Sequence, residues 1–200
     1  HEQACAMAAE GYARITGRLA VVNVTTGPGG INALNGVFGA FTDSIPMLIL
    51  SGQVKRATCL DFVPVPGLRQ LGDQEGPIIQ MAKPVTVFAE VARQPEDLAR
   101  LLPDALIAAT RGRPGPAWID IPLDIQSAKL NLTLPAVPPA VREDSPDLPG
   151  HCDAILARLQ SSHRPLILAG TGVRIANAQP ELLAFAETTD VDLDVTDVLR

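Results

Sequence analysis

The chain has 200 residues, of which 46% are hydrophobic and 19% charged, with a formal net charge of −6. This balance is typical of a folded globular protein and argues against a disordered chain. The acidic charge leaves no basic stripe to displace counterions from phosphates, so we expect no nucleic-acid partner. No apolar run approaches the roughly 20 residues that cross a bilayer, so we expect no membrane partner.

The N-terminal quarter of the chain predicts a helix followed by a βαβ unit. Residues 2–16 carry small and apolar residues at helical spacing. Residues 19–24 are short, apolar and β-branched, which predicts a strand buried on both faces. A glycine-rich turn at 25–30, a helix at 31–41 and a second buried strand at 46–50 follow. This order predicts a parallel sheet with a right-handed crossover.

The alternation of helices and strands continues after an irregular segment at 55–83. Residues 85–88 and 117–121 predict strands. Between them, residues 95–111 have a helical pattern that Pro103 interrupts. Because a proline inside a helix costs about 3 kcal/mol, we expect a kink or a break there.

A proline-rich stretch between Pro135 and Pro149 predicts a linker. The predicted domains are residues 1–127, the linker 128–149, and residues 150–200 as the beginning of a second α/β domain that is cut short. Within the second domain we expect a helix to about residue 160, strands at 165–169 and 191–195, a GTG turn at 170–172 and a helix at 180–187.

Three stretches together resemble the pyrimidine-binding domain of thiamine diphosphate enzymes in the acetolactate synthase and pyruvate oxidase branch. They are HEQACAMAAEGYAR at 1–14, VTTGPGGINALNGVFGAFTDSIPMLILSGQV at 24–54 and RPGPAWIDIPLDIQ at 113–126. Residues 164–187 look like the start of that family's middle domain. The resemblance implies an α/β fold with a mostly parallel sheet flanked by helices, lacking its first strand or strands. The start of a second, Rossmann-like α/β domain would follow.

The resemblance also implies an activity, which is thiamine-diphosphate-dependent decarboxylation of a 2-oxo acid, with pyruvate favoured, and carboligation to an acetohydroxy acid. The implied cofactors are thiamine diphosphate and Mg²⁺, with the metal held by a domain absent from this chain. Some members bind FAD and others do not, and the GTG turn leaves this open. The family builds its active site between two chains, which implies a second copy as partner in a homodimer or homotetramer.

The cofactor-activating acid of the family falls on Glu2. A carboxyl group hydrogen-bonded to the aminopyrimidine ring favours the tautomer that can take the proton from the thiazolium carbon. We expect an apolar setting to raise the pKa of this carboxyl group. Residues consistent with such a setting are Ala4, Ala6, Met7 and Ala8. His1 is interpreted as structural, and Glu10 as a structural or interface acid.

The remaining candidates lie on the glycine-rich turn and at a strand end. In the family this turn lies beside the pyrimidine ring, so Gly27, Pro28, Gly29 and Asn32 are candidate cofactor contacts, with a purely structural turn as the alternative. Gln53 follows a buried strand, where ligands of open α/β sheets gather. Its amide is expected to reach the substrate carboxylate or an intermediate. No metal ligand is expected in this chain.

The match loosens at residues 67–86, which look more like acetolactate synthase-like proteins of uncertain substrate. The charged residues there, Arg69, Asp73 and Glu75, are expected to form a solvated loop, with a subunit contact or a substrate lid as the alternative. Cys5, Cys59 and Cys152 lie far apart without CxxC spacing, which predicts reduced thiols in a cytoplasmic protein.

Other functions stay open. The nearest is another thiamine diphosphate enzyme, such as a 2-oxo acid decarboxylase, a glyoxylate carboligase or a sulfoacetaldehyde acetyltransferase. A non-catalytic scaffold module is a second alternative. A Rossmann-type dehydrogenase is disfavoured, because neither glycine turn carries the GxGxxG fingerprint with an acid about 20 residues further on.

Overall fold

The computed structural model describes residues 1–130, 135–136 and 146–195. The chain divides into two compact units, His1–Pro139 and Ala140–Arg200. Most of the predicted linker, residues 131–134 and 137–145, lies outside the described residues. None of the described helices is long and apolar enough to cross a membrane.

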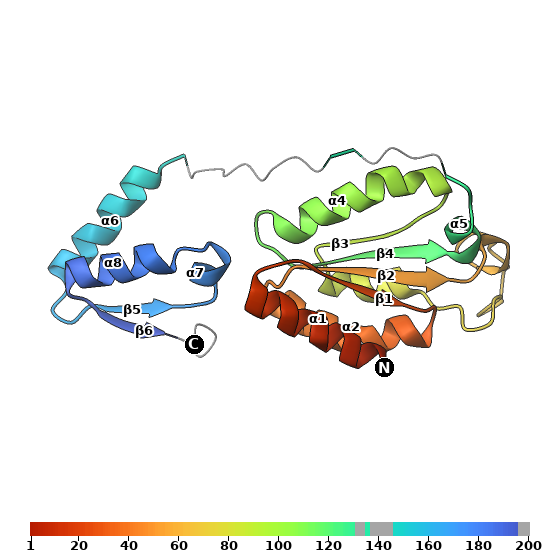
Figure 1. The fold of residues 1–200 in the computed structure, drawn as a ribbon, viewed down its shortest axis with the longest axis horizontal. Helices are drawn as coiled ribbons and strands as arrows, with labels where there is room; N and C mark the ends of the chain where they lie inside the picture. The colour runs from red at the N-terminus through yellow and green to blue at the C-terminus, as the bar shows by residue number, and fades with distance from the viewer. Residues whose placement is uncertain (131–134, 137–145, 196–200) are drawn as a thin grey trace. The chain divides into compact units, whose positions relative to one another are not determined.

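The first unit confirms the predicted α/β class, with a sheet of four parallel strands in the order β1-β2-β4-β3 (Figure 1). The strands are β1 (Ala20–Val24), β2 (Met47–Gln53), β3 (Phe88–Val91) and β4 (Pro116–Pro122). The α-helices are α1 (Glu2–Thr16), α2 (Pro28–Thr42), α3 (Ile78–Ala82), α4 (Leu98–Thr110) and α5 (Leu123–Gln126). Three short 3-10 helices complete the unit: η1 (Arg56–Thr58), η2 (Lys83–Val85) and η3 (Pro95–Asp97).

Helices cover both faces of this sheet, and the central strand β2 supplies side chains to both cores. Met47 and Ile49 belong to the core that α1, α2 and α3 share with the sheet. Leu48 belongs to the opposite core, beside Leu101 of α4. Successive side chains of a strand point to opposite faces, so a strand covered on both sides needs a continuous apolar run. The apolar stretch at 46–50 meets that requirement.

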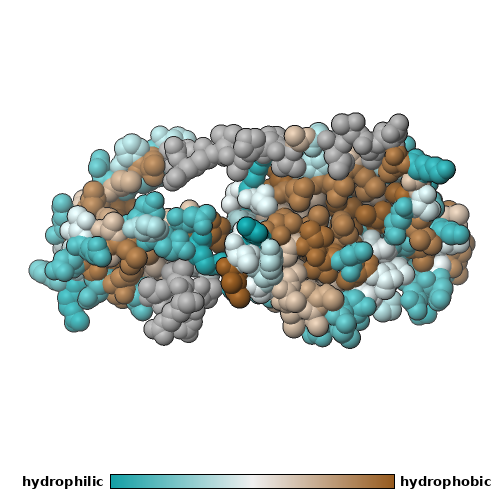
Figure 2. All heavy atoms as spheres, in the orientation of Figure 1, coloured by the Kyte–Doolittle hydropathy of each residue, from teal (hydrophilic) through white to brown (hydrophobic). Residues whose placement is uncertain are grey.

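The prediction that residues 19–24 form a strand buried on both faces is wrong. Val21 is 58% exposed and Asn23 is exposed, whereas the other three residues of β1 are buried. The cause is the position of β1 at the edge of the sheet, because α4 packs on β2, β3 and β4. Figure 2 shows hydrophobic side chains gathered on the first unit between α4 and α1.

Several predicted boundaries move. The helix α2 begins at Pro28 because the glycine-rich turn forms its first turn, with proline in the position that needs no N–H. β2 continues three residues beyond the prediction. β3 lies three residues later than expected, because η2 occupies residues 83–85. Of the kink or break expected at Pro103, the break is wrong: α4 runs through this buried residue, whose burial counters the lost hydrogen bond.

The second unit contains the helices and strands predicted after the linker, together with a short helix at residues 172–175 that was not predicted after the GTG turn. They are α6 (Leu148–Ser161), β5 (Leu166–Ala169), α7 (Gly172–Ile175), α8 (Gln179–Thr189) and β6 (Asp192–Val195). β5 and β6 pair in parallel. Leu166 and Leu168 of β5 are exposed, so one face of this small sheet is uncovered within the described residues.

Candidate active site

The candidate site begins where two parallel helices, α1 and α2, approach closely. A Cβ on Gly36 of α2 would lie only 2.7 Å from the Cβ of Ala6 on α1, so the absence of a side chain permits this contact. One helical turn earlier on both helices, the same alignment brings Asn32 opposite Glu2. The spacing of four residues on each helix therefore determines which polar pair meets at their N-terminal ends.

Two other polar residues at or on α1, His1 and Glu10, have structural roles, as predicted. The Nδ1 atom of His1 accepts a hydrogen bond from the backbone N–H of Gln3 at 3.3 Å and caps α1. Glu10 forms an ion pair of 2.5 Å with Arg14, which also reaches Asp43 on the far end of α2 at 2.6 Å. The ion pairs of Arg14 join α1 to the end of α2 that lies away from Glu2.

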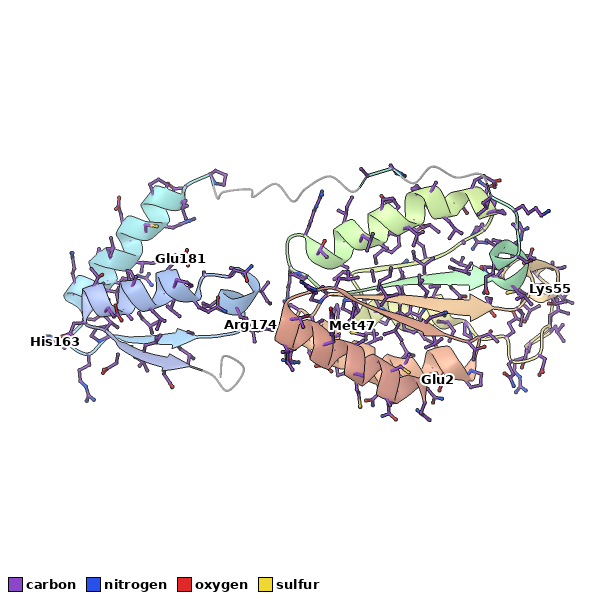
Figure 3. The ribbon with its side chains drawn as sticks, in the orientation of Figure 1. Glu2, Met47, Lys55, His163, Arg174 and Glu181 are labelled. Atoms are coloured by element: carbon purple, nitrogen blue, oxygen red, sulfur yellow. The ribbon has the colours of Figure 1, made fainter. Side chains whose placement is uncertain are left out.

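Glu2 lies at the N-terminal end of α1, at the same end of the unit as Lys55, where the strands have their carboxyl ends (Figure 3). Asn32 Nδ2 donates a hydrogen bond to Glu2 Oε2 at 3.2 Å. The carboxyl group's own backbone N–H and the Asn32 amide hold the pKa of Glu2 below its ordinary value. The expected apolar setting is wrong for this chain by itself, because the carboxyl is partly exposed and only Ala6 of its four apolar neighbours is buried.

The glycine-rich turn brings a buried stretch of backbone close to this carboxyl group, because Gly29 has no side chain. A Cβ on Gly29 would lie 2.7 Å from Thr25 Cγ2 and 3.6 Å from Glu2 Oε1. Gly29, Asn32 and Glu2 therefore border one small region, where a flat ring with a ring nitrogen would meet both backbone and carboxylate. The residues present fit a pyrimidine ring. Pro28 is exposed at the start of α2.

Gly27 has a different neighbour, the segment that precedes α3. Its backbone has φ 52° and ψ −111°, and a Cβ would lie 2.1 Å from the backbone oxygen of Gln74. Only glycine is compatible with both the positive φ and this contact. Gly27 thus joins the turn to residues 74–76.

Gln53 is buried at the end of β2, and the protein uses all of its hydrogen-bonding capacity. Its Nε2 atom donates to the Gly76 carbonyl at 3.0 Å and to Asp120 Oδ2 at 2.9 Å. Its Oε1 atom accepts from the Thr26 hydroxyl at 2.9 Å and the Val54 N–H at 3.0 Å. An amide group offers two donor hydrogens and two acceptor positions. The geometry thus leaves the Gln53 amide no free position for a ligand.

Sequence reasoning missed the buried polar residues beside Gln53. The Ser51 hydroxyl donates to Asp120 Oδ1 at 2.5 Å, and Trp118 Nε1 donates to Ser51 Oγ at 2.8 Å. Burial raises the pKa of Asp120 to about 6, against the opposing effect of its hydrogen bonds from Ser51 and Gln53. The available signal was an aspartate inside the otherwise apolar run AWIDI, since buried carboxyl groups need specific partners.

A cavity of about 550 Å³ opens beside these residues. It lies at the carboxyl ends of β2, β3 and β4, where ligands of parallel sheets bind. Its lining includes Gln53, Asp120, Arg69, Arg93 and the buried Cys59. All three cysteines are free, as expected, and burial raises the pKa of Cys59 to about 11, so this thiol is protonated at neutral pH.

Glu75 differs from the predicted solvated acid. Its carboxylate accepts hydrogen bonds from the backbone N–H groups of Leu60 at 2.6 Å and of Leu71 and Gly72 at 3.0 Å each. Burial raises its pKa, but these N–H groups and the Cys59 thiol together lower it below the ordinary value. Arg69 and Asp73 are exposed, as a solvated loop requires. Among the described residues, no group of three or more His, Cys, Asp or Glu side chains could hold a metal ion.

Comparisons with known proteins identify the family of the N-terminal part of the chain. Residues 1–75 match the family described as the thiamine pyrophosphate enzyme N-terminal TPP-binding domain. The acetolactate synthase large subunit of Buchnera aphidicola subsp. Schizaphis graminum is 36% identical over 192 residues, covering 94% of this chain and 32% of that protein. The chloroplastic acetolactate synthase of Arabidopsis thaliana is 32% identical over 206 residues, covering 98% of this chain and 28% of that protein.

A solved structure gives the same result. The X-ray structure of a protein from Mycobacterium smegmatis, described as a thiamin diphosphate-dependent enzyme, matches with a TM-score of 0.81 at 26% identity. The match covers 98% of this chain and 36% of that one. The chain thus spans about a third of the length of the relatives it matches. Its first 75 residues are a thiamine pyrophosphate enzyme N-terminal TPP-binding domain, and nearly the whole chain is similar to acetolactate synthases.

Proposed function

We propose that the full-length protein decarboxylates a 2-oxo acid, with pyruvate favoured, and joins the remaining fragment to a second carbonyl compound, giving an acetohydroxy acid. The observation that carries the proposal is the Glu2–Asn32 pair beside the side-chain-free backbone at Gly29. The names of the relatives support the choice of acetolactate synthase-like chemistry.

The residues of this chain would hold the pyrimidine end of the cofactor. Bound thiamine diphosphate supplies an acidic thiazolium carbon and a ring that accepts electrons. Glu2 would share a proton with the pyrimidine ring, and Asn32 would orient the carboxyl group. The turn of Gly27, Pro28 and Gly29 would lie beside the ring, with Pro28 as its exposed residue. Covering Glu2 would exclude water and raise the pKa that is low in the uncovered site.

For Gln53 we propose a place on the substrate side of the site. It borders the cavity at the carboxyl end of the sheet. Because its amide hydrogen bonds are all made within the protein, its contribution to a substrate contact would be the shape of the cavity wall.

No described residue is assigned to Mg²⁺ or FAD, so both enter only as part of the proposed function. We assign Mg²⁺ to the domain that binds the diphosphate, which is outside this chain. FAD would show as flavin absorbance of the purified full-length protein. The GTG turn gives no support for it, since a Cβ on Gly170 or Gly172 would meet nothing within 4 Å. A cytoplasmic location is proposed from the free thiols.

A second copy of the chain is the proposed partner, in a homodimer or homotetramer. The outer face of α1 and α2 is apolar, with Ile15 87% exposed and Phe38 57% exposed, and α2 carries no charged residue. The side chains of Glu10 and Arg14 are mostly buried toward α2. A charge-free apolar face beside Glu2 favours cover by another protein surface.

Replacing Phe38 with Asp should dissociate this oligomer. A carboxylate buried in an apolar interface costs several kcal/mol, so we expect the dissociation constant to rise at least about 100-fold. Analytical ultracentrifugation of the full-length protein measures this constant. The control is Val63→Asp, at a residue 43% exposed on the loop before α3, which should leave the mass unchanged. A Phe38→Asp protein with the native assembly would exclude this face as the interface.

The proposed function is tested on full-length protein with thiamine diphosphate, Mg²⁺ and pyruvate, following carbon dioxide and acetolactate together. One carbon dioxide and one acetolactate for every two pyruvates consumed support the proposal. Free aldehyde instead of acetolactate identifies a simple decarboxylase. Turnover of another 2-oxo acid alone corrects the substrate. If thiamine diphosphate does not bind, the scaffold function replaces the enzyme.

A further inference from the structure

We propose that Asp120 is a positioning residue for the cofactor site, which holds Gln53 in the one orientation that joins the Gly27 turn to the Gly76 segment. The identity of the cofactor rests on the proposed function. The placement of the turn rests on the hydrogen bonds alone. Asp120 acts through its neighbours, because its two carboxylate oxygens accept from Ser51 and from Gln53.

Backbone groups determine the orientation of the Gln53 amide, because each of them can only donate or only accept a hydrogen bond. The Gly76 carbonyl can only accept and the Val54 N–H can only donate, so the Gln53 amide has a single satisfied orientation. In that orientation the second Nε2 hydrogen points at Asp120 Oδ2. On its other oxygen Asp120 accepts from a Ser51 hydroxyl whose oxygen already accepts from Trp118. In this arrangement Asp120 accepts on both oxygens, which an ionised carboxylate does and an amide cannot.

Gln53 connects the two sides of a close backbone contact. Its oxygen accepts from Thr26, the residue before Gly27, and its nitrogen donates to Gly76. The turn and the segment also touch directly, since a Cβ on Gly76 would lie 3.4 Å from the Gly27 Cα. Removing the acceptor beneath Gln53 would free its amide to rotate, and the turn would lose its tie to β2.

The charge distribution favours positioning over packing as the role of this carboxyl group. Asp120 is 2% exposed, and no described cation is paired with it. The charged residues that line the neighbouring cavity are Asp61, Arg69, Glu75 and Arg93. Of these, Arg93 is paired with Asp61 at 2.9 Å, and Glu75 binds backbone N–H groups. Burying a carboxylate without a paired cation is unfavourable. What Asp120 provides in return is two acceptor oxygens, one for Ser51 and one for Gln53.

The test compares Asp120→Asn with the control Asp61→Asn, which removes a carboxylate from the same cavity without touching Gln53. In full-length protein we expect Asp120→Asn to weaken thiamine diphosphate binding roughly 10- to 100-fold, the effect of one lost charge-assisted hydrogen bond. The affinity of the native protein for thiamine diphosphate should also fall as the pH drops through about 6, because Asp120 takes up a proton. The Asp120→Asn protein should lack that component of the pH profile. Asp61→Asn should keep it at a lower pH, because burial raises the pKa of Asp120 and the Asp61 charge contributes to that rise.

A second variant keeps the proposal testable if the buried substitution impairs folding. Thr26→Val removes the hydroxyl that donates to Gln53 and leaves the carboxylate in place. It should weaken cofactor binding in the same direction, and the loss in the double variant should be smaller than the sum of the two single losses. Additive losses, or native affinity in Asp120→Asn, would overturn the proposal.

Amide hydrogen exchange gives a readout that needs no cofactor. Exchange at the Val54 N–H and in the turn at 25–29 should accelerate in Asp120→Asn and stay native in Asp61→Asn. Unchanged exchange overturns the positioning role. If exchange is faster in Asp120→Asn but the native protein does not bind thiamine diphosphate, the positioning role of Asp120 stands and the proposed function is overturned. The two failures are therefore distinguishable.

Discussion

Replacing Glu2 with Gln is expected to lower kcat for acetolactate formation roughly 100- to 10,000-fold, the usual contribution of a positioned acid or base. The amide preserves the size of the side chain and can still accept the hydrogen bond from Asn32. It cannot, however, exchange a proton with a ring nitrogen. Steady-state kinetics on the full-length enzyme, with saturating thiamine diphosphate and Mg²⁺, measure the effect.

The matched control is Glu10→Gln, the same chemical change two helical turns along α1. Glu10 is paired with Arg14, and Arg14 keeps its second partner Asp43 in this variant. Partly exposed ion pairs contribute about 1 kcal/mol or less, so we expect kcat within roughly threefold of the native value. If Glu2→Gln and Glu10→Gln gave similar rates, Glu2 would not be the activating acid.

Replacing Gly27 with Ala is expected to have the largest effect on stability, lowering the free energy of unfolding by about 3 kcal/mol or more. The positive φ of 52° strains any residue with a Cβ, and that atom would lie 2.1 Å from the Gln74 backbone oxygen. A backbone oxygen cannot rotate away as the end of a flexible side chain can. Urea unfolding gives the stability, and calorimetry gives the accompanying loss of thiamine diphosphate binding.

Gly67→Ala separates the two causes of that loss. Gly67 also has a positive φ, of 76°, but a Cβ there would meet nothing within 4 Å. The variant therefore retains the backbone strain without the close contact, and we expect a cost of about 1 to 2 kcal/mol. Equal costs at Gly27 and Gly67 would show that the contact with Gln74 contributes nothing.

The sequence predicts this fold best where one local pattern has one structural solution. The helix over residues 2–16 and the central strand β2 follow from spacing and from continuous apolar character. The edge strand β1 has a similar apolar composition, so its exposed face depends on which strands and helices lie beside it. Pro103 was similarly ambiguous, because burial of its ring decides the outcome and depends on tertiary packing.

In the candidate site, too, some features follow from the sequence and others depend on tertiary contacts. Glu2, Gly29 and Asn32 meet as the resemblance implied, because small residues such as Gly36 let α1 approach α2. The sequence correctly predicts that Gln53 lies at the end of a buried strand, and its contact with a ligand stays a prediction. Its saturation by hydrogen bonds, however, depends on Asp120, 67 residues further along the chain. No local pattern in a single sequence identifies a partner at that separation.

The carboxylate of Glu75 closes a loop, because it binds backbone N–H groups at Leu60 and at Leu71 and Gly72. Doubling the length of such a loop costs only about 0.6 kcal/mol of closure entropy. Residues between these anchors, including Arg69 on the cavity wall, can therefore be exchanged, inserted or deleted at little cost to the sheet or the glycine turn. The wall of the cavity can therefore vary in this segment while the Gly27 turn and the Glu2–Asn32 pair stay unchanged.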